Sequence, residues 1–191
     1  MFARLTMIAS GATQATRKGR FPSDEAPEPW ALDHASVLAS SLRRADRVWT
    51  SPALAARRTA EALGLDATVE PLLGEQDFGR WAGKGFKEVQ AEDPKGMAAW
   101  LADPDAAPHG GESLAAVARR GVALMERLAA ESGHTIALTH AVPIRAAIVH
   151  VLGAPLSAIW KIDIEPLSLT ELRSDGRRWA LHASGVAARA K

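Results

Sequence analysis

The chain has 191 residues, of which 47% are hydrophobic and 24% charged, and this predicts one domain with its own core over residues 1–191. Its net charge of +1 gives no electrostatic reason to expect binding to nucleic acid or to an anionic membrane. The chain contains no cysteine, which excludes disulfides, thiolate metal ligands and a cysteine nucleophile, and which favours a cytoplasmic location.

The first third of the chain alternates strand and helix signals. In order, we expect a strand, a polar proline-rich loop, a helix, a second strand and a second helix, over residues 4–8, 11–29, 31–42, 46–50 and 51–63. Ser51 is expected to cap the second helix, with Pro52 in its first turn.

The rest of the chain continues the alternation. It predicts a short strand, a helix with the longest apolar repeat, a strand, a helix and three final strands, over residues 67–71, 112–131, 134–139, 143–152, 160–164, 168–173 and 178–182. Between the first two of these, residues 72–108 are predicted to be irregular with one or two short helices, packed down by Trp81, Phe86 and Trp100. Such alternation favours an α/β fold with a largely parallel sheet.

Three predicted strands end in glycine turns or helix starts, at residues 9–13, 50–52 and 139–141. In open parallel sheets, ligands bind outside the carboxyl ends of the strands, where free backbone N–H groups favour an anion. The sequence alone therefore predicts an anion-binding crevice that carries His140.

Five segments resemble, in order, the motifs of the histidine phosphatase superfamily, the phosphoglycerate mutase-like proteins. They are the strand and glycine turn at residues 4–13 and the segments 51–60, 73–83, 108–113 and 138–145. The resemblance covers almost the whole chain. It implies a three-layer α/β sandwich with a mostly parallel central sheet and helices on both faces.

The resemblance also implies a set of catalytic positions. In this family, two histidines and two arginines surround a phosphoryl group that passes through a phosphohistidine, and a glutamate supplies acid or base chemistry. This chain keeps the second histidine as His140 and the glutamate as Glu75. It has Ser10 at the position of the nucleophilic histidine, and Ala9 and Ala55 at those of the two arginines.

These replacements weigh against the family reaction. Removing one preorganised donor typically costs on the order of 10²–10³ in rate, so losing two arginines costs roughly 10⁴ or more. We therefore expect a pseudo-phosphatase that binds a ligand or a partner. The alternative is a weak or altered phosphomonoester hydrolase that uses Glu75, His140 and either Ser10 or Arg58. Ser10 is otherwise interpreted as a small turn residue.

Four further residues are predicted to contact a ligand: Gly11, Ser51, Arg58 and Arg145. Arg58 lies one helical turn after Ala55 and is long enough to lean back toward the vacated space. The other interpretation makes it a solvated surface arginine. The remaining histidines lack ligand-like spacing, so we predict no metal site and no cofactor.

The partner is expected to be a small or phosphate-like molecule, or a protein. No apolar run approaches the roughly 20 residues that span a bilayer, so no membrane partner is predicted. A third interpretation is self-association through exposed tryptophans, for which Trp30, Trp49 and Trp160 are the candidates. The oligomeric state itself is not predicted.

Overall fold

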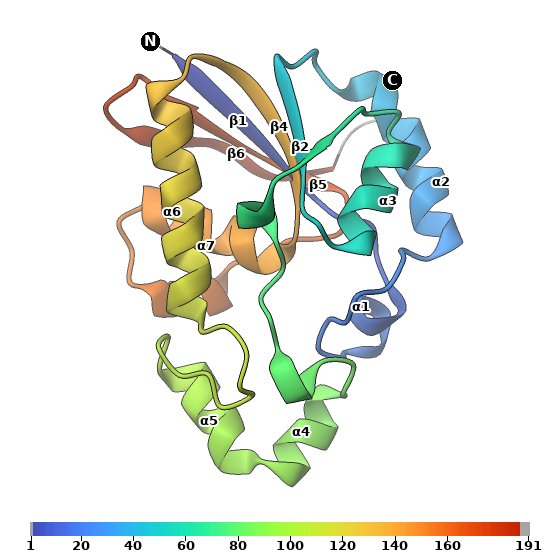
Figure 1. Ribbon diagram of the computed structural model, residues 1–191, viewed down its shortest axis with the longest axis vertical. Helices are drawn as coiled ribbons and strands as arrows, with labels where there is room; N and C mark the ends of the chain where they lie inside the picture. Colours follow the sequence, from blue (N-terminus) through green and yellow to red (C-terminus); the bar gives the residue numbers. More distant parts are fainter. Residues whose placement is uncertain (1, 188–191) are drawn as a thin grey trace.

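A six-stranded sheet forms the centre of the computed structural model, which describes residues 2–187 (Figure 1). Its strands are β1 (Ala3–Ala9), β2 (Arg47–Thr50), β3 (Thr68–Val69), β4 (Gly133–Thr139), β5 (Ser168–Ser174) and β6 (Trp179–Ala187). They lie in the order β3-β2-β4-β1-β5-β6. The first four strands of this order are parallel, while β5 and β6 pair antiparallel. The prediction of a mostly parallel sheet is confirmed.

Helices cover both faces of the sheet. The long helices are α2 (Pro29–Leu38), α3 (Leu54–Ala62), α6 (Leu114–Ala130) and α7 (Ala141–Val151). The shorter ones are α1 (Gln14–Lys18), α4 (Phe86–Glu92) and α5 (Pro94–Ala102), with 3-10 helices η1 (Ala39–Ser41), η2 (Pro71–Leu73), η3 (Gly79–Trp81) and η4 (Leu156–Lys161). Figure 1 shows α6 and α7 on one side, α2 and α3 on the other, and α1, α4 and α5 beyond the end at which β1, β2 and β4 finish.

Alternation along the central strands divides the core between these layers. In β1, Leu5 and Met7 pack in a cluster with residues of α6 and α7, whereas Ile8 packs with residues of α2 and α3. In β4, Ala137 faces the first cluster and Ile136 the second. This period of two produces the three-layer sandwich, because neighbouring side chains on a strand point to opposite faces.

A separate aromatic cluster holds the segment around α4 and α5. Phe21, which is fully buried, lies 5.1 Å from Phe78 and 5.2 Å from Trp81, measured between ring centroids. Trp100 is also buried in this cluster, whereas Phe86 packs on Phe21 but stays 44% exposed. The predicted packing role of Trp81 and Trp100 is confirmed. Phe86 packs against Phe21 but is not buried.

Two of the recognised motifs meet backbone to backbone. A Cβ on Gly79 would lie 2.3 Å from His109 O, and one on Gly111 would lie 2.2 Å from Asp77 O. The backbone N–H of Glu112 donates to Asp77 O at 2.8 Å. Glycine is needed at both contacts because any side chain would separate the two segments.

Three local predictions are wrong. Residues 160–164 do not form a strand, since η4 covers Leu156–Lys161 and buries Ile159 against Leu114 and Val149. The helix predicted from Ser51 begins at Leu54, with Ala53 as its N-cap. The loop predicted over residues 11–29 contains the short helix α1, which Thr13 caps by accepting from the Thr16 N–H.

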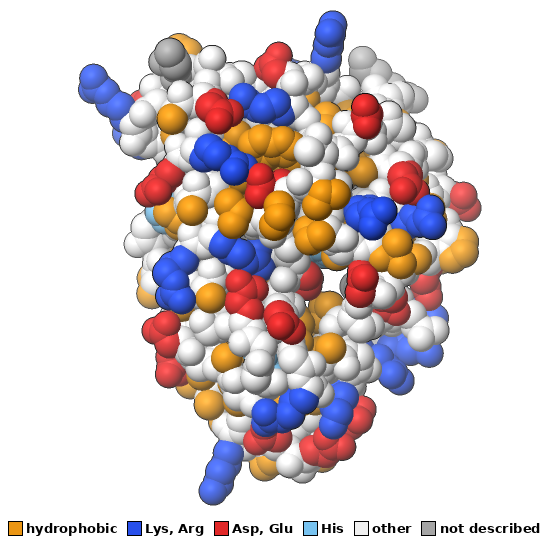
Figure 2. Space-filling view, in the orientation of Figure 1, with side chains coloured by type: hydrophobic (Ala, Val, Ile, Leu, Met, Phe, Trp, Pro, Cys, Tyr) orange, Lys and Arg blue, Asp and Glu red, His pale blue; other side chains and the backbone are white. Residues whose placement is uncertain are grey.

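The surface seen in Figure 2 carries acidic and basic side chains interspersed, with apolar side chains gathered across its upper middle. This pattern presents no broad field of one sign on that face. Among residues 2–187, no helix combines the length and apolar character needed to cross a bilayer.

The α6–sheet interface gives a direct test of the core. Leu124 is 2% exposed and belongs to the cluster between the sheet, α6 and α7. Leu124→Ala is expected to lower the free energy of unfolding by about 2–5 kcal/mol, because it removes buried methyl groups and leaves a cavity. Leu152→Ala is the matched control, since Leu152 is 60% exposed and should change stability little. Urea denaturation measures both, and equal effects of the two variants would contradict the assigned core.

Candidate functional site

Three strand ends meet where β1, β4 and β2 finish side by side (Figure 1). The ladder continues one residue past the strands, because Ser10 N–H donates to Thr139 O and Ser51 N–H donates to Leu138 O, both at 2.8 Å. These two bonds place Ser10 and Ser51 on either side of His140. The carboxyl ends of the strands thus bring together residues from separate parts of the chain.

His140 lies at the centre of this group and is 6% exposed. Its Nε2 is 2.9 Å from Ser51 Oγ. Its Nδ1 is 3.4 Å from Ser10 Oγ and 3.6 Å from Glu75 Oε2. The predicted residues Glu75, His140, Ser10 and Ser51 therefore form one contiguous cluster.

The contacts of the imidazole indicate which nitrogen carries its proton. We assign the proton to Nδ1, because a carboxylate oxygen of Glu75 faces that nitrogen and stabilises an N–H there. Nε2 then accepts from the hydroxyl of Ser51, whose oxygen in turn accepts from the Ala53 N–H at 3.2 Å. In this arrangement His140 donates toward Ser10 and does not remove its proton.

The charge state of His140 follows from its burial. Burial lowers the pKa of His140 below its ordinary value of 6.5, an effect that outweighs the nearby Glu75 carboxylate. Arg120 also lowers this pKa, and Asp24 raises it. The imidazole is consequently neutral at pH 7.

Arg120 is the guanidinium nearest to this cluster in the hydrogen-bond network, and it is already paired. It forms a bidentate ion pair with Glu112, with N···O distances of 2.8 and 3.0 Å. Its remaining donors reach the backbone carbonyls of Leu72 at 2.7 Å and Glu75 at 3.1 Å. Arg120 thus fixes the loop that presents Glu75, and Glu112 neutralises its charge.

The beginning of α3 is occupied by the protein itself. Asp24 Oδ1 accepts from the Leu54 N–H at 2.7 Å, and Ser51 Oγ accepts from the Ala53 N–H. These are N–H groups at a helix start, where an anion would otherwise bind. The Asp24 carboxylate therefore occupies the position at which the sequence predicted a ligand anion.

Gly11 and the two alanines also lack free polar groups toward the crevice. The Gly11 N–H donates to Thr59 Oγ1 at 2.9 Å, and Thr59 donates on to Ala55 O at 2.7 Å. Ala9 and Ala55 are 3% and 7% exposed. The backbone donor predicted at Gly11 is thus used inside the fold.

The two predicted arginines have partners elsewhere. Arg58 donates to Glu61 at 2.8 Å, and its side chain is 54% exposed, as the surface interpretation expected. Arg145 lies 3.5 Å from Asp163, measured from Nη2 to Oδ1. Neither guanidinium has a hydrogen bond or ion pair with His140, Ser10 or Glu75 among the described side chains.

Asp24, Arg120 and Thr59 are the site residues that sequence reasoning missed. Arg120 offers a signal, because it stands three residues after Val117 and four before Leu124, on the apolar stripe of α6. A charged residue at such a position needs a buried partner. Asp24 offers none, since its role depends on how a long loop folds across α3. Within residues 2–187, no cluster of three or more His, Cys, Asp or Glu side chains is placed to hold a metal ion.

The burial of His140 predicts a pH dependence of stability. Because its pKa is lower in the folded chain than the ordinary 6.5, the unfolded chain takes up this proton at the higher pH. The contribution of His140 to stability is therefore complete above pH 6.5 and is lost as the pH falls through 6.5 toward the folded pKa. His140→Gln is expected to lose less unfolding free energy than the parent between about pH 8 and about pH 5, as measured by urea denaturation. Parallel pH profiles for the two proteins would refute a buried neutral imidazole.

Comparison with known proteins identifies the family. The family model of the histidine phosphatase superfamily (branch 1) matches residues 11–186. A bifunctional protein of Mycobacterium tuberculosis is 34% identical over 146 residues, covering 74% of this chain and 38% of that protein. The chain thus spans 38% of the length of this relative.

Two further likenesses extend over nearly the whole chain. An adenosylcobalamin/alpha-ribazole phosphatase of Salmonella typhimurium is 30% identical over 174 residues, covering 85% of this chain and 86% of the relative. The native structure of a mycobacterial glucosyl-3-phosphoglycerate phosphatase superposes with a TM-score of 0.82 at 25% identity, covering 97% of this chain and all of that one. With the fold and these matches in agreement, the chain belongs to the histidine phosphatase superfamily.

Proposed function

We propose that this chain is a non-catalytic member of its superfamily, a pseudo-phosphatase that acts by binding a ligand or a protein partner. One observation carries the proposal: the buried imidazole of His140 is held by Ser51, Ser10 and Glu75, with no guanidinium in contact with it among the described residues. A phosphoryl group needs fixed cations, and planar guanidinium groups supply them best.

Electrostatics support the absence of phosphate chemistry. The ionised groups around the crevice are the carboxylates of Glu75 and Asp24, because His140 is neutral and Arg120 is paired with Glu112. Two like charges about 4 Å apart repel by about 4 kcal/mol at an effective dielectric constant of about 20. A phosphate ester entering here would approach two carboxylates, and Arg120, whose guanidinium is hydrogen-bonded to the Glu75 backbone, is already paired with Glu112.

The two serines are poor nucleophiles for different reasons. Ser10 is partly exposed, but His140 donates toward its oxygen and so does not act as its base. Ser51 donates to His140 and is better activated, but it is 0% exposed, so no substrate reaches its oxygen. The serine hydroxyl that His140 can activate, Ser51, is therefore not the one that a substrate can reach, Ser10.

A second candidate function is a weak or altered phosphomonoester hydrolase. It is favoured by the convergence of Ser10, His140 and Glu75 within 3.4 and 3.6 Å, and by the phosphatase names of the relatives. In that reaction Glu75 would act as the base and His140 as a neutral donor to the phosphoryl oxygens. Arg58, paired with Glu61 on the surface, would have to leave that partner to take part.

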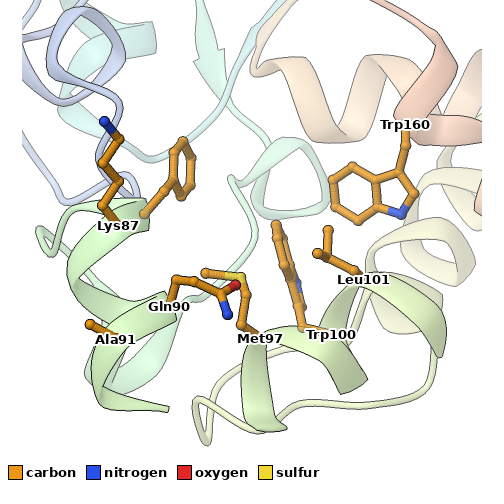
Figure 3. A pocket seen from close by; sticks show the side chains of 8 residues that line it. Lys87, Gln90, Ala91, Met97, Trp100, Leu101 and Trp160 are labelled. Atoms are coloured by element: carbon orange, nitrogen blue, oxygen red, sulfur yellow. The ribbon is translucent and has the colours of Figure 1, made fainter. Parts of the chain in front are cut away.

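The binding role has a candidate surface away from the crevice. An apolar groove of about 640 Å³ lies between α4, α5 and η4, and Figure 3 shows Trp100 and Trp160 side by side in its wall. Their ring centroids are 4.8 Å apart. Phe86, Leu101 and Trp160 are 44%, 47% and 39% exposed. We infer that a protein partner contacts this groove, since exposed aromatic residues are enriched at interfaces.

The tryptophans named for self-association differ in exposure. Trp30 is 46% exposed and Trp160 39%. Trp49 is only partly exposed, because the Arg127 guanidinium lies 4.8 Å from its ring centroid, and this corrects its prediction as a free contact. Of these three tryptophans, Trp160 lines the apolar groove between α4, α5 and η4. The cytoplasmic location stays part of the proposal and rests on the cysteine-free sequence.

Turnover tests the proposal directly. The purified protein should hydrolyse an aryl phosphate and a panel of small phosphometabolites no faster than His140→Ala and Ser10→Ala purified in parallel, because no residue combines activation with access. Phosphate release measures the rates of all three.

The three proteins also separate the two candidate functions. Activity that disappears in His140→Ala or Ser10→Ala would overturn the pseudo-phosphatase and establish the hydrolase. Activity that is equal in all three reports a contaminating enzyme and leaves the protein itself without turnover.

A further inference from the structure

A second cavity lies on the sheet, toward the end where β1 and β4 begin and away from the His140 crevice. Its volume is about 350 Å³. Strands β1, β4, β5 and β6 form its floor, and the segment 41–43 after α2 forms one wall. Helix α3 packs on β2 and β4, and α2 packs on α3 (Figure 1).

Part of the cavity lining is apolar. Leu169 and Val186 contribute to it from the strands and Leu42 from the 41–43 segment, and Val186 is 48% exposed. Apolar side chains that are left open at a concave surface favour a ligand with an apolar body. Its size suits one small molecule.

The polar side of the cavity carries excess positive charge. The single carboxylate of Glu171 is shared by the guanidinium groups of Arg4 and Arg173, and His182 Nε2 lies 3.8 Å from it. Arg43 lines the same cavity from the exposed 41–43 segment. Arg4 and Arg43 line this end of the cavity with one carboxylate, that of Glu171, so its lining carries a net positive charge.

Arg4 also has an unused donor. Its Nε is buried and has no hydrogen-bond partner within the described part of the chain. A buried guanidinium donor without an acceptor costs free energy, so Glu171 does not satisfy every donor of Arg4.

We propose that this cavity binds an organic anion, an apolar body that carries one carboxylate, sulfonate or phosphate group. The charged group lies between Arg4 and Arg43, and the body covers Leu169 and Val186. This site is separate from the cluster of Ser10, Ser51, Glu75 and His140 at the other end of the strands. It does not depend on whether the crevice is catalytic.

Decanoate is a suitable probe because it joins one carboxylate to an apolar chain. Isothermal titration should show saturable binding to the parent protein. Arg43→Glu should weaken that binding at least about tenfold, because it reverses a charge beside the carboxylate. Arg57→Glu is the matched control: Arg57 is an exposed arginine on α3, outside the cavity, and its replacement should leave the affinity unchanged.

A cationic probe of the same shape separates charge recognition from adsorption to apolar surface. Decyltrimethylammonium should bind at least about tenfold more weakly than decanoate. Absence of saturable decanoate binding, equal affinities for the two probes, or equal effects of the two variants would each overturn the proposal. Circular dichroism of both variants verifies that each is folded.

Discussion

The hydrogen bond between His140 Nε2 and Ser51 Oγ, 2.9 Å long, is the contact on which the arrangement of the crevice depends. It joins the end of β4 to the end of β2. Ser51 Oγ also accepts from the Ala53 N–H, so the same side chain contacts the residue that precedes α3. A buried imidazole must have its polar atoms satisfied, because an unpaired one would cost about 1–3 kcal/mol. The two serines and Glu75 meet that requirement. His140 can therefore be retained for structure as well as for chemistry.

The same burial determines the electrostatic character of the crevice. A pocket with two arginines and two histidines attracts phosphate, whereas this one presents Glu75 and Asp24 around a neutral ring. The remaining guanidinium, that of Arg120, is used to hold Glu112 and the loop before Glu75. Arg4 and Arg43 line the cavity at the opposite end of the sheet. The fold of the family is kept, and we propose that its phosphate-binding charges are not.

Local strand and helix signals were sufficient to predict most of the sheet and the three strand ends that carry Ser10, Ser51 and His140, whereas Glu75 was predicted from the family resemblance. The strand predicted over residues 160–164 was wrong because the 3-10 helix η4 extends into its first two residues and buries Ile159, which precedes them, against Val149 of α7.

Other features depend on contacts far apart in the chain. Asp24 meets Leu54 thirty residues away, and its loop gives no periodic signal. Arg58 lies three residues after Ala55 and three before Glu61, so its side chain could extend toward either one. In the structure it pairs with Glu61. Local patterns cannot decide between two such partners for a long side chain.

We propose that Ala9, Ser10 and Ala55 leave the site around His140 without affinity for phosphate, because they supply no cation. Calorimetric titration of inorganic phosphate into the parent protein and into Ala9→Arg/Ser10→His/Ala55→Arg measures this directly. We expect no saturable binding to the parent at concentrations up to about 10 mM, and binding with a Kd below about 1 mM to the triple variant. Saturable binding of phosphate to the parent that is abolished by His140→Ala would contradict the account.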